Sequence, residues 1–134
     1  MARRLILDTS VLVTAERAGL NLGRTFGDDD DIVIAAITVA ELRAGIELGH
    51  ASHRASRTTF LARILESLPV EPYDLRTAEV HGQLLAHARA AGRQRGAHDT
   101  VIAATAISTQ RTLVTADKAA RFHELPGLQC VLIS

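Results

Sequence analysis

The chain has little of what would link it to a disulfide framework, a zinc cluster or a membrane. Cys130 is the only cysteine, so an internal disulfide and a multi-cysteine zinc site are both excluded. Its place in the apolar run 130–133 favours a small buried side chain. No apolar run approaches the roughly 20 residues that a membrane-spanning helix needs. Asp8 interrupts the first apolar stretch after three residues, which argues against a secretory signal. We therefore expect a cytoplasmic protein with no membrane partner.

An excess of charge of one sign is also absent. The formal net charge is +0, which argues against a protein that coats nucleic acid without specificity. A local basic rim around an acidic site is compatible with that balance. Lys118 is the only lysine, so arginine carries nearly all the positive charge, and its guanidinium suits bidentate contacts to phosphate. The 134 residues, 47% of them hydrophobic, suffice for one core and are too few for two, which predicts a single domain over 1–134.

Short apolar runs typical of buried strands alternate along the chain with segments of helical periodicity. Such alternation predicts an α/β fold in which a parallel sheet lies between helices on both faces, a three-layer sandwich. The predicted strands or extended segments are 5–7, 32–37, 69–72, 112–115 and 128–133. The predicted helices are 38–49, 52–68, 74–91, 99–107 and a short one at 117–122.

Four acidic residues share one structural context in this predicted fold. Asp8 and Asp117 come at or just after strand ends, Asp99 opens an apolar helix, and Glu41 lies in the first turn of a helix that follows a strand. Because parallel strands deliver their carboxyl ends to one edge of a sheet, these acids are expected to meet there. Two carboxylates about 5 Å apart repel by roughly 3 kcal/mol at an effective dielectric constant near 20. Cations would offset that repulsion, and oxygen ligands of this kind suit Mg²⁺ or Mn²⁺.

Each acid also has a plainer interpretation as part of a helix cap. Asp8, Asp99 and Asp117 could each cap the helix that follows them. Thr38 and Glu41 match the spacing of a capping box, in which the threonine caps the helix and the glutamate bonds back to the threonine amide. Capping alone does not explain why carboxylates, rather than serine or threonine, occupy several such positions at one edge.

Four segments carry a resemblance to a known family. They are 7–12 (LDTSVL), 38–45 (TVAELRAG), 97–106 (AHDTVIAATA) and 113–117 (LVTAD). Together they resemble the motifs of PIN-domain nucleases and, more narrowly, of the VapC-type toxins of bacterial type II toxin–antitoxin pairs. The resemblance spans the whole chain, with the segments in the order and at the overall length that the family has.

The resemblance implies a five-stranded parallel sheet between helices and Mg²⁺-dependent endoribonuclease activity, with Mn²⁺ as a substitute. By motif, Asp8 and Asp99 would bind the metal directly, Glu41 would complete the site directly or through water, and Asp117 would match a fourth acidic position. Cleavage by metal-activated water would leave 5′-phosphate and 3′-hydroxyl ends. The implied partners are a cognate VapB-type antitoxin, an RNA for which transfer RNA is a candidate, and a second toxin copy in a homodimer.

Two positions near the last motif depart from the family's pattern. Ala116 follows Thr115 where many relatives have an asparagine shortly after the threonine, and Arg121 precedes Phe122 where many have a further acid. Thr9 and Thr115 could orient carboxylates or water beside the metal. His98 neighbours Asp99, and the expected chemistry needs no histidine. The candidates for a phosphate-binding rim are Arg43, Arg93, Arg95 and Lys118.

Two other function classes compete with this interpretation. A haloacid-dehalogenase-like phosphatase also has an aspartate after its first strand, but it needs a second aspartate two residues later, where this chain has Ser10. A binding module, either a receiver-like domain or an inactive PIN domain, is the second alternative. A receiver groups several acids near its first strands and has a lysine after a late strand, for which Lys118 is the only candidate. An inactive PIN domain usually lacks some of the acids, and this chain has candidates for all four.

Overall fold

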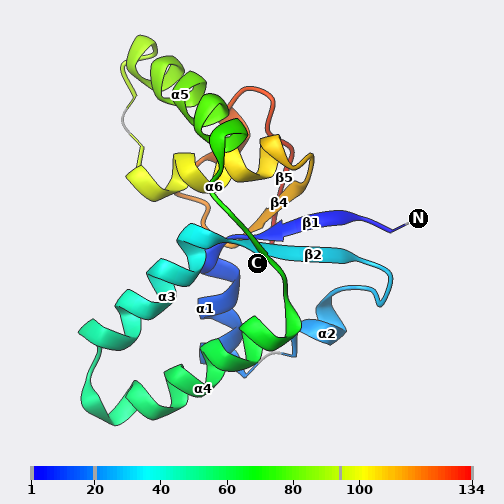
Figure 1. Ribbon diagram of the computed structural model, residues 1–134, viewed down its shortest axis with the longest axis vertical. Helices are drawn as coiled ribbons and strands as arrows, with labels where there is room; N and C mark the ends of the chain where they lie inside the picture. The colour runs from blue at the N-terminus through cyan, green and yellow to red at the C-terminus, as the bar shows by residue number, and fades with distance from the viewer. Residues whose placement is uncertain (1, 20, 94, 134) are drawn as a thin grey trace.

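The computed structural model describes residues 2–19, 21–93 and 95–133, and its centre is a five-stranded parallel sheet (Figure 1). The strands are β1 (Arg4–Leu7), β2 (Asp31–Ala35), β3 (Val70–Glu71), β4 (Thr112–Thr115) and β5 (Cys130–Leu132). Their order across the sheet is β3-β2-β1-β4-β5, and every neighbouring pair is parallel. Within this sheet Leu7, the last residue of β1, lies beside Ile34 of β2 and Val114 of β4.

Helices cover both faces of the sheet. They are α1 (Thr9–Ala18), α2 (Leu22–Thr25), α3 (Ala36–Leu48), α4 (Ala51–Ser67), α5 (Leu75–Ala90), α6 (Ala97–Ser108) and the 3₁₀ helix η1 (Phe122–Glu124). In Figure 1, α5 and α6 lie on one side of the sheet, while α1, α3 and α4 lie on the other. The predicted three-layer α/β/α sandwich with about five parallel strands is confirmed.

Alternation along β1 divides the core into two apolar clusters, one on each face of the sheet. Ile6 points to the face where the buried residues come mainly from α5, α6 and η1. Leu5 and Leu7 point to the opposite face, where they pack with residues of α1, α4 and the α2 region. All three side chains are at most 3% exposed. Because both faces of β1 are covered, its residues 5–7 form a continuous apolar run, as buried parallel strands require.

Two local predictions are wrong. The predicted capping box at Thr38 is absent, because β2 passes into α3 at Ala35 and Ala36 with no loop, which makes Thr38 the third residue of the helix. Glu41 therefore lies in the second turn and bonds to Thr9 and His98 rather than to a backbone amide.

The predicted helix at 117–122 is also wrong. The segment forms a bend and a turn, and a helical turn begins only at Phe122. Arg121 has a φ of 50°, in the left-handed region, which a continuing right-handed helix does not allow. In addition, the carbonyl oxygens of Ala120 and Arg121 both accept hydrogen bonds from the side chain of Arg95. A distant side chain thus stabilises a turn that local helical periodicity cannot predict.

Cys130 is half-buried against the apolar cluster beneath α5 and α6, not fully buried as its apolar run predicts. Burial still raises the pKa of its thiol. Over residues 2–19, 21–93 and 95–133, no helix combines the length and the apolar character needed to cross a membrane.

Candidate active site

Asp8 lies at the carboxyl end of β1 and is 5% exposed. Its Oδ1 accepts the backbone N–H of Thr9 at 2.9 Å, so Asp8 is the N-cap of α1, as predicted. Its Oδ2 accepts the hydroxyls of Ser10 at 2.7 Å and Thr115 at 2.8 Å. Three donors hold the carboxylate in one orientation. Because each carboxylate oxygen has two lone pairs, Oδ1 retains one that a cation can use.

The same two hydroxyls join the end of β4 to the end of β1. The Thr115 hydroxyl donates to Asp8 and accepts the backbone N–H of Asp117 at 3.0 Å. The Ser10 hydroxyl donates to Asp8 and accepts the backbone N–H of Ala116 at 2.9 Å. Each hydroxyl is therefore both donor and acceptor, and the loop that follows β4 is held against the Asp8 carboxylate.

Glu41 faces this region from α3. Its Oε1 accepts the Thr9 hydroxyl at 2.7 Å, and that hydroxyl also lies 3.2 Å from the hydroxyl of Thr38, which is fully buried. On its other side, Oε2 lies 3.2 Å from Nδ1 of His98. The Thr9 hydroxyl thus orients the Glu41 carboxylate, while the Thr9 backbone N–H donates to Asp8. His98, which sequence reasoning treats as a bystander, contacts the acidic cluster directly.

Asp99 is the third residue of α6, and its half-buried side chain approaches Gly96. A Cβ atom at Gly96 would lie 3.0 Å from Oδ2 of Asp99, so the glycine leaves room for the carboxylate. Burial and the nearby charges of Asp8, Asp117 and Glu41 raise the pKa of Asp99 to about 6. The opposing effect of Arg95 is smaller. The structure therefore places all four predicted acids in one electrostatic environment at the carboxyl edge of the sheet.

Asp117 lies in the turn that follows β4, two residues beyond Thr115. Its Oδ1 accepts the backbone N–H of Ala120 at 3.2 Å, which closes the turn. The carboxylate is half-buried and contributes to the raised pKa of Asp99. Asp117 caps a turn rather than a helix, because the helix predicted to follow it does not form.

The donor chemistry of this cluster fits a hard divalent cation, since all four acidic side chains offer carboxylate oxygens. The negative charge of the four acids also favours a bound cation, because a cation would relieve the repulsion that contributes to the raised pKa of Asp99. Within the described ranges, no three histidine, cysteine, aspartate or glutamate side chains are placed to hold a metal together. This geometry is compatible with Mg²⁺, which usually binds one or two carboxylates and keeps several of its waters.

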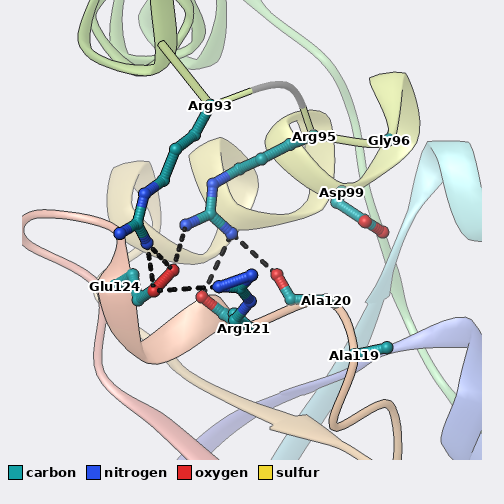
Figure 2. Close-up of a pocket in the computed structure, with 8 residues that line it drawn as sticks. All are labelled: Arg93, Arg95, Gly96, Asp99, Ala119, Ala120, Arg121 and Glu124. Atoms are coloured by element: carbon teal, nitrogen blue, oxygen red, sulfur yellow. Dashed lines mark hydrogen bonds and ion pairs between the residues drawn. The ribbon is translucent and has the colours of Figure 1, made fainter. Parts of the chain in front are cut away.

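Of the predicted basic rim, Arg93 and Arg95 lie beside the cluster. Together with Arg121 and Glu124 they line a pocket of about 460 Å³ that reaches Gly96 and Asp99 (Figure 2). Figure 2 shows the Asp99 carboxylate pointing away from the arginines, so the pocket adjoins the acidic cluster without containing it. The other two predicted rim residues, Arg43 on α3 and Lys118 after Asp117, have exposed side chains and are not among the pocket's lining residues.

Sequence reasoning missed Ser10, Arg121 and Glu124 as parts of the site region. A hydroxyl two residues after Asp8 is a signal that could have found Ser10, because the start of a helix brings that side chain back toward its cap. Arg121 and Glu124 lie three residues apart, the spacing of a local ion pair, and that spacing offered only a weak signal. Their convergence with Arg93 is a tertiary contact across 31 residues, for which no local pattern exists.

Comparison with known proteins agrees with this geometry. The profile of the PIN domain family matches residues 5–128. A VapC ribonuclease of Sinorhizobium fredii is 33% identical over 123 residues, which cover 84% of this chain and 86% of that protein. Ribonuclease VapC of Rickettsia bellii is 25% identical over 130 residues, which cover 96% of each protein.

Solved structures show the same fold. A VapBC family toxin–antitoxin structure from Mycobacterium tuberculosis matches with a TM-score of 0.79 and 25% identity, covering 97% of this chain and 98% of that one. The VapBC2 structure from Rickettsia felis, bound to a promoter DNA fragment, matches with a TM-score of 0.88 and 23% identity over 98% of this chain and 99% of that one. The chain belongs to the PIN domain family and, within it, to the VapC-type ribonuclease toxins.

Proposed function

We propose that this chain is a toxic endoribonuclease that hydrolyses RNA phosphodiester bonds at the cluster of Asp8, Glu41, Asp99 and Asp117, with Mg²⁺ as cofactor and Mn²⁺ as a substitute. One observation carries the proposal: burial, together with the charges of three other carboxylates, raises the pKa of Asp99. Such a concentration of negative charge is unfavourable in a site that must approach a polyanion, unless a cation is part of the working enzyme. We also propose that residues 1–134 act as a single domain in the cytoplasm.

Asp8 and Asp99 are the proposed direct ligands, because three donors orient the Asp8 carboxylate and the half-buried Asp99 carboxylate lies near the charges of the other acids. Glu41 would complete this site directly or through water, and Asp117 would be a ligand of a second ion. When a divalent cation is bound, the chemistry it supplies is charge neutralisation at the phosphate and a lower pKa for water. The chain's own contribution is orientation: Ser10, Thr9 and Thr115 hold carboxylates in place through the hydroxyl contacts described above.

The proposal is tested by the ends of the cleaved RNA. Transfer RNA is the first substrate to assay, and sequencing the 5′ ends of RNA after induction in cells identifies the cleaved bond. Attack by water is expected to leave 5′-phosphate and 3′-hydroxyl ends. Cells that express Asp99→Asn in parallel provide the control, in which those ends should disappear. If the new ends were 5′-hydroxyls with cyclic phosphates, the ribose 2′-hydroxyl would be the nucleophile and the proposed water-based mechanism would be wrong.

We further propose that a cognate VapB-type antitoxin neutralises the chain, in a complex that contains a homodimer of the toxin. An acidic cluster beside an exposed surface suits a partner that inserts a basic side chain, such as arginine, among the carboxylates. That cation would replace the charge of the metal, so antitoxin and metal should compete.

The expected result is that antitoxin affinity falls as Mg²⁺ rises, and that the dependence is flatter in Asp8→Asn. Titration calorimetry at several Mg²⁺ concentrations measures both. A partner that inhibits only by displacing active-site residues would bind equally at every concentration, which would contradict charge replacement without affecting the assignment as a toxin.

A further inference from the structure

The pocket beside Asp99 is built around one carboxylate and three guanidinium groups. Arg93 Nη1 donates to both oxygens of Glu124, at 2.8 and 2.6 Å. Arg95 Nη2 lies 3.5 Å and Arg121 Nη1 3.8 Å from the same carboxylate. Three arginines therefore surround a single glutamate, and two positive charges are left uncompensated by it. This concentration of positive charge adjoins the acid that is proposed to bind the metal.

The three arginines differ in what they can offer a ligand. The Arg95 side chain is 10% exposed, and its Nη1 donates to the carbonyl oxygens of Ala120 at 2.7 Å and Arg121 at 3.1 Å. These bonds occupy Nη1, and they hold the turn that contains Arg121. Arg95 therefore supports the pocket wall instead of making the phosphate contact that was predicted for it.

Arg93 and Arg121 are exposed and keep free donors. Their side chains are 58% and 57% exposed. Arg93 uses only Nη1 for Glu124, and among the described residues Arg121 makes no side-chain hydrogen bond, only the 3.8 Å ion pair. A guanidinium presents five N–H donors in a planar arrangement that matches phosphate oxygens. Glu124 thus pairs with one amino group of each arginine, while most of their donors stay available to a ligand.

We propose that this pocket binds a backbone phosphate of the RNA, adjacent to the phosphate that is cleaved, with Arg121 and Arg93 as the contacting groups and Glu124 as a counter-charge that limits affinity. The inference rests on the proposed ribonuclease activity. RNA is the favoured occupant because the pocket reaches Gly96 and Asp99, so a chain whose scissile phosphate lies at the cluster must carry its next phosphate over neighbouring surface. The proposed antitoxin would also reach the cluster, but with a basic side chain, whereas RNA carries a negative charge at every nucleotide.

The test uses opposite charge changes at neighbouring residues. Kinetics are measured with Mg²⁺ on an RNA that the wild-type chain cleaves. Arg121→Gln should raise KM about fivefold to tenfold with little change in kcat, since a remote phosphate contact acts equally on substrate and transition state. The slope of log kcat/KM against log salt should flatten by about 0.7, the effect of one lost phosphate contact on a single strand. Glu124→Gln should lower KM severalfold, because it removes a competing negative charge.

Two further variants make the result decisive. Arg121→Lys keeps the charge and should keep most of the salt dependence. Arg76→Gln is the matched control: its exposed side chain lines a different pocket, with Arg4 and Ser108, where β1 begins and α6 ends. Its KM should equal that of the wild type.

Three outcomes would overturn the phosphate subsite while leaving the ribonuclease assignment intact. In the first, Arg121→Gln has the same KM as Arg76→Gln. In the second, Glu124→Gln raises KM, which would mean that Glu124 is needed only to keep the pocket wall folded. In the third, Arg121→Gln weakens antitoxin binding and leaves RNA binding unchanged. Absence of cleavage by the wild type would instead refute the proposed function itself. If Arg121→Gln fails to fold, Arg121→Lys and Glu124→Gln still decide between the alternatives.

Discussion

Asp99→Asn should reduce RNA cleavage by at least about a thousandfold, because it removes a charge that is proposed to bind the metal from a group of residues that act as a unit. The change keeps the side-chain volume nearly constant, so loss of packing is not a competing cause. Without metal, Asp99→Asn should also be more stable than the wild type, since it removes the carboxylate whose pKa is raised by burial and by three like charges. Cleavage assays and urea unfolding in chelator measure the two effects.

Asp8→Asn should abolish cleavage equally, but its effect on stability should differ. The Asp8 carboxylate accepts bonds from the hydroxyls of Ser10 and Thr115, and an amide nitrogen in place of Oδ2 cannot accept them. Asp8→Asn should therefore be less stable than Asp99→Asn. The matched control is Asp74→Asn, which changes another N-cap carboxylate, on α5. Asp74→Asn should keep full activity, which would show that changing a helix-capping carboxylate does not by itself abolish cleavage.

If Asp99→Asn instead kept full activity, Asp99 would not belong to the catalytic site.

The sequence predicts most of the fold because the sheet is buried on both faces. Runs such as Leu5-Ile6-Leu7 must be apolar throughout, and they are short and separated by amphipathic helices, a pattern with few alternative folds. Boundaries were harder to predict where two elements join without a loop. At Ala35 the strand becomes a helix with no capping side chain, so the next capping signal along the chain, at Thr38, misplaced the helix start.

The acidic cluster was predictable because parallel topology brings strand ends together whatever their separation in sequence. Contacts that depend on how far a long side chain extends cannot be predicted in this way. Arg95 was predicted as a phosphate contact, yet its side chain crosses to the carbonyls of Ala120 and Arg121 and is nearly buried. The left-handed backbone at Arg121 also depends on Arg95, because the bonds from the Arg95 side chain compensate for a conformation that the local sequence disfavours. A single sequence carries no signal for either.

Removal of divalent metal should abolish cleavage, and Mg²⁺ or Mn²⁺ should restore it. Ca²⁺ should bind and support little turnover, because its more flexible coordination positions water poorly. A dialysed enzyme assayed in chelator and then with each ion provides the measurement. The expected loss is as large as that of Asp99→Asn, since either change leaves the phosphate charge without compensation. Robust cleavage in chelator would contradict the whole carboxylate–metal mechanism.

In the metal-free protein, Asp99 should also affect the pH dependence of stability in the direction opposite to that of most carboxylates. The folded pKa of Asp99, about 6, lies above its ordinary value of 3.8, so the folded state binds the proton more tightly than the unfolded state does. The contribution of Asp99 to the stability of the metal-free protein should therefore fall as pH rises from about 4 to above 6, by on the order of 1–2 kcal/mol after allowance for solvent screening. Saturating Mg²⁺ at pH 7.5 should more than restore it, since a ligand at 100 times its Kd contributes about 2.7 kcal/mol. Asp99→Asn, measured by urea unfolding at the same pH values, should lack this component of the pH dependence. Identical profiles for the two proteins in chelator would show that neither burial nor neighbouring charge raises the pKa of Asp99, and the electrostatic argument for a shared metal site would then fail.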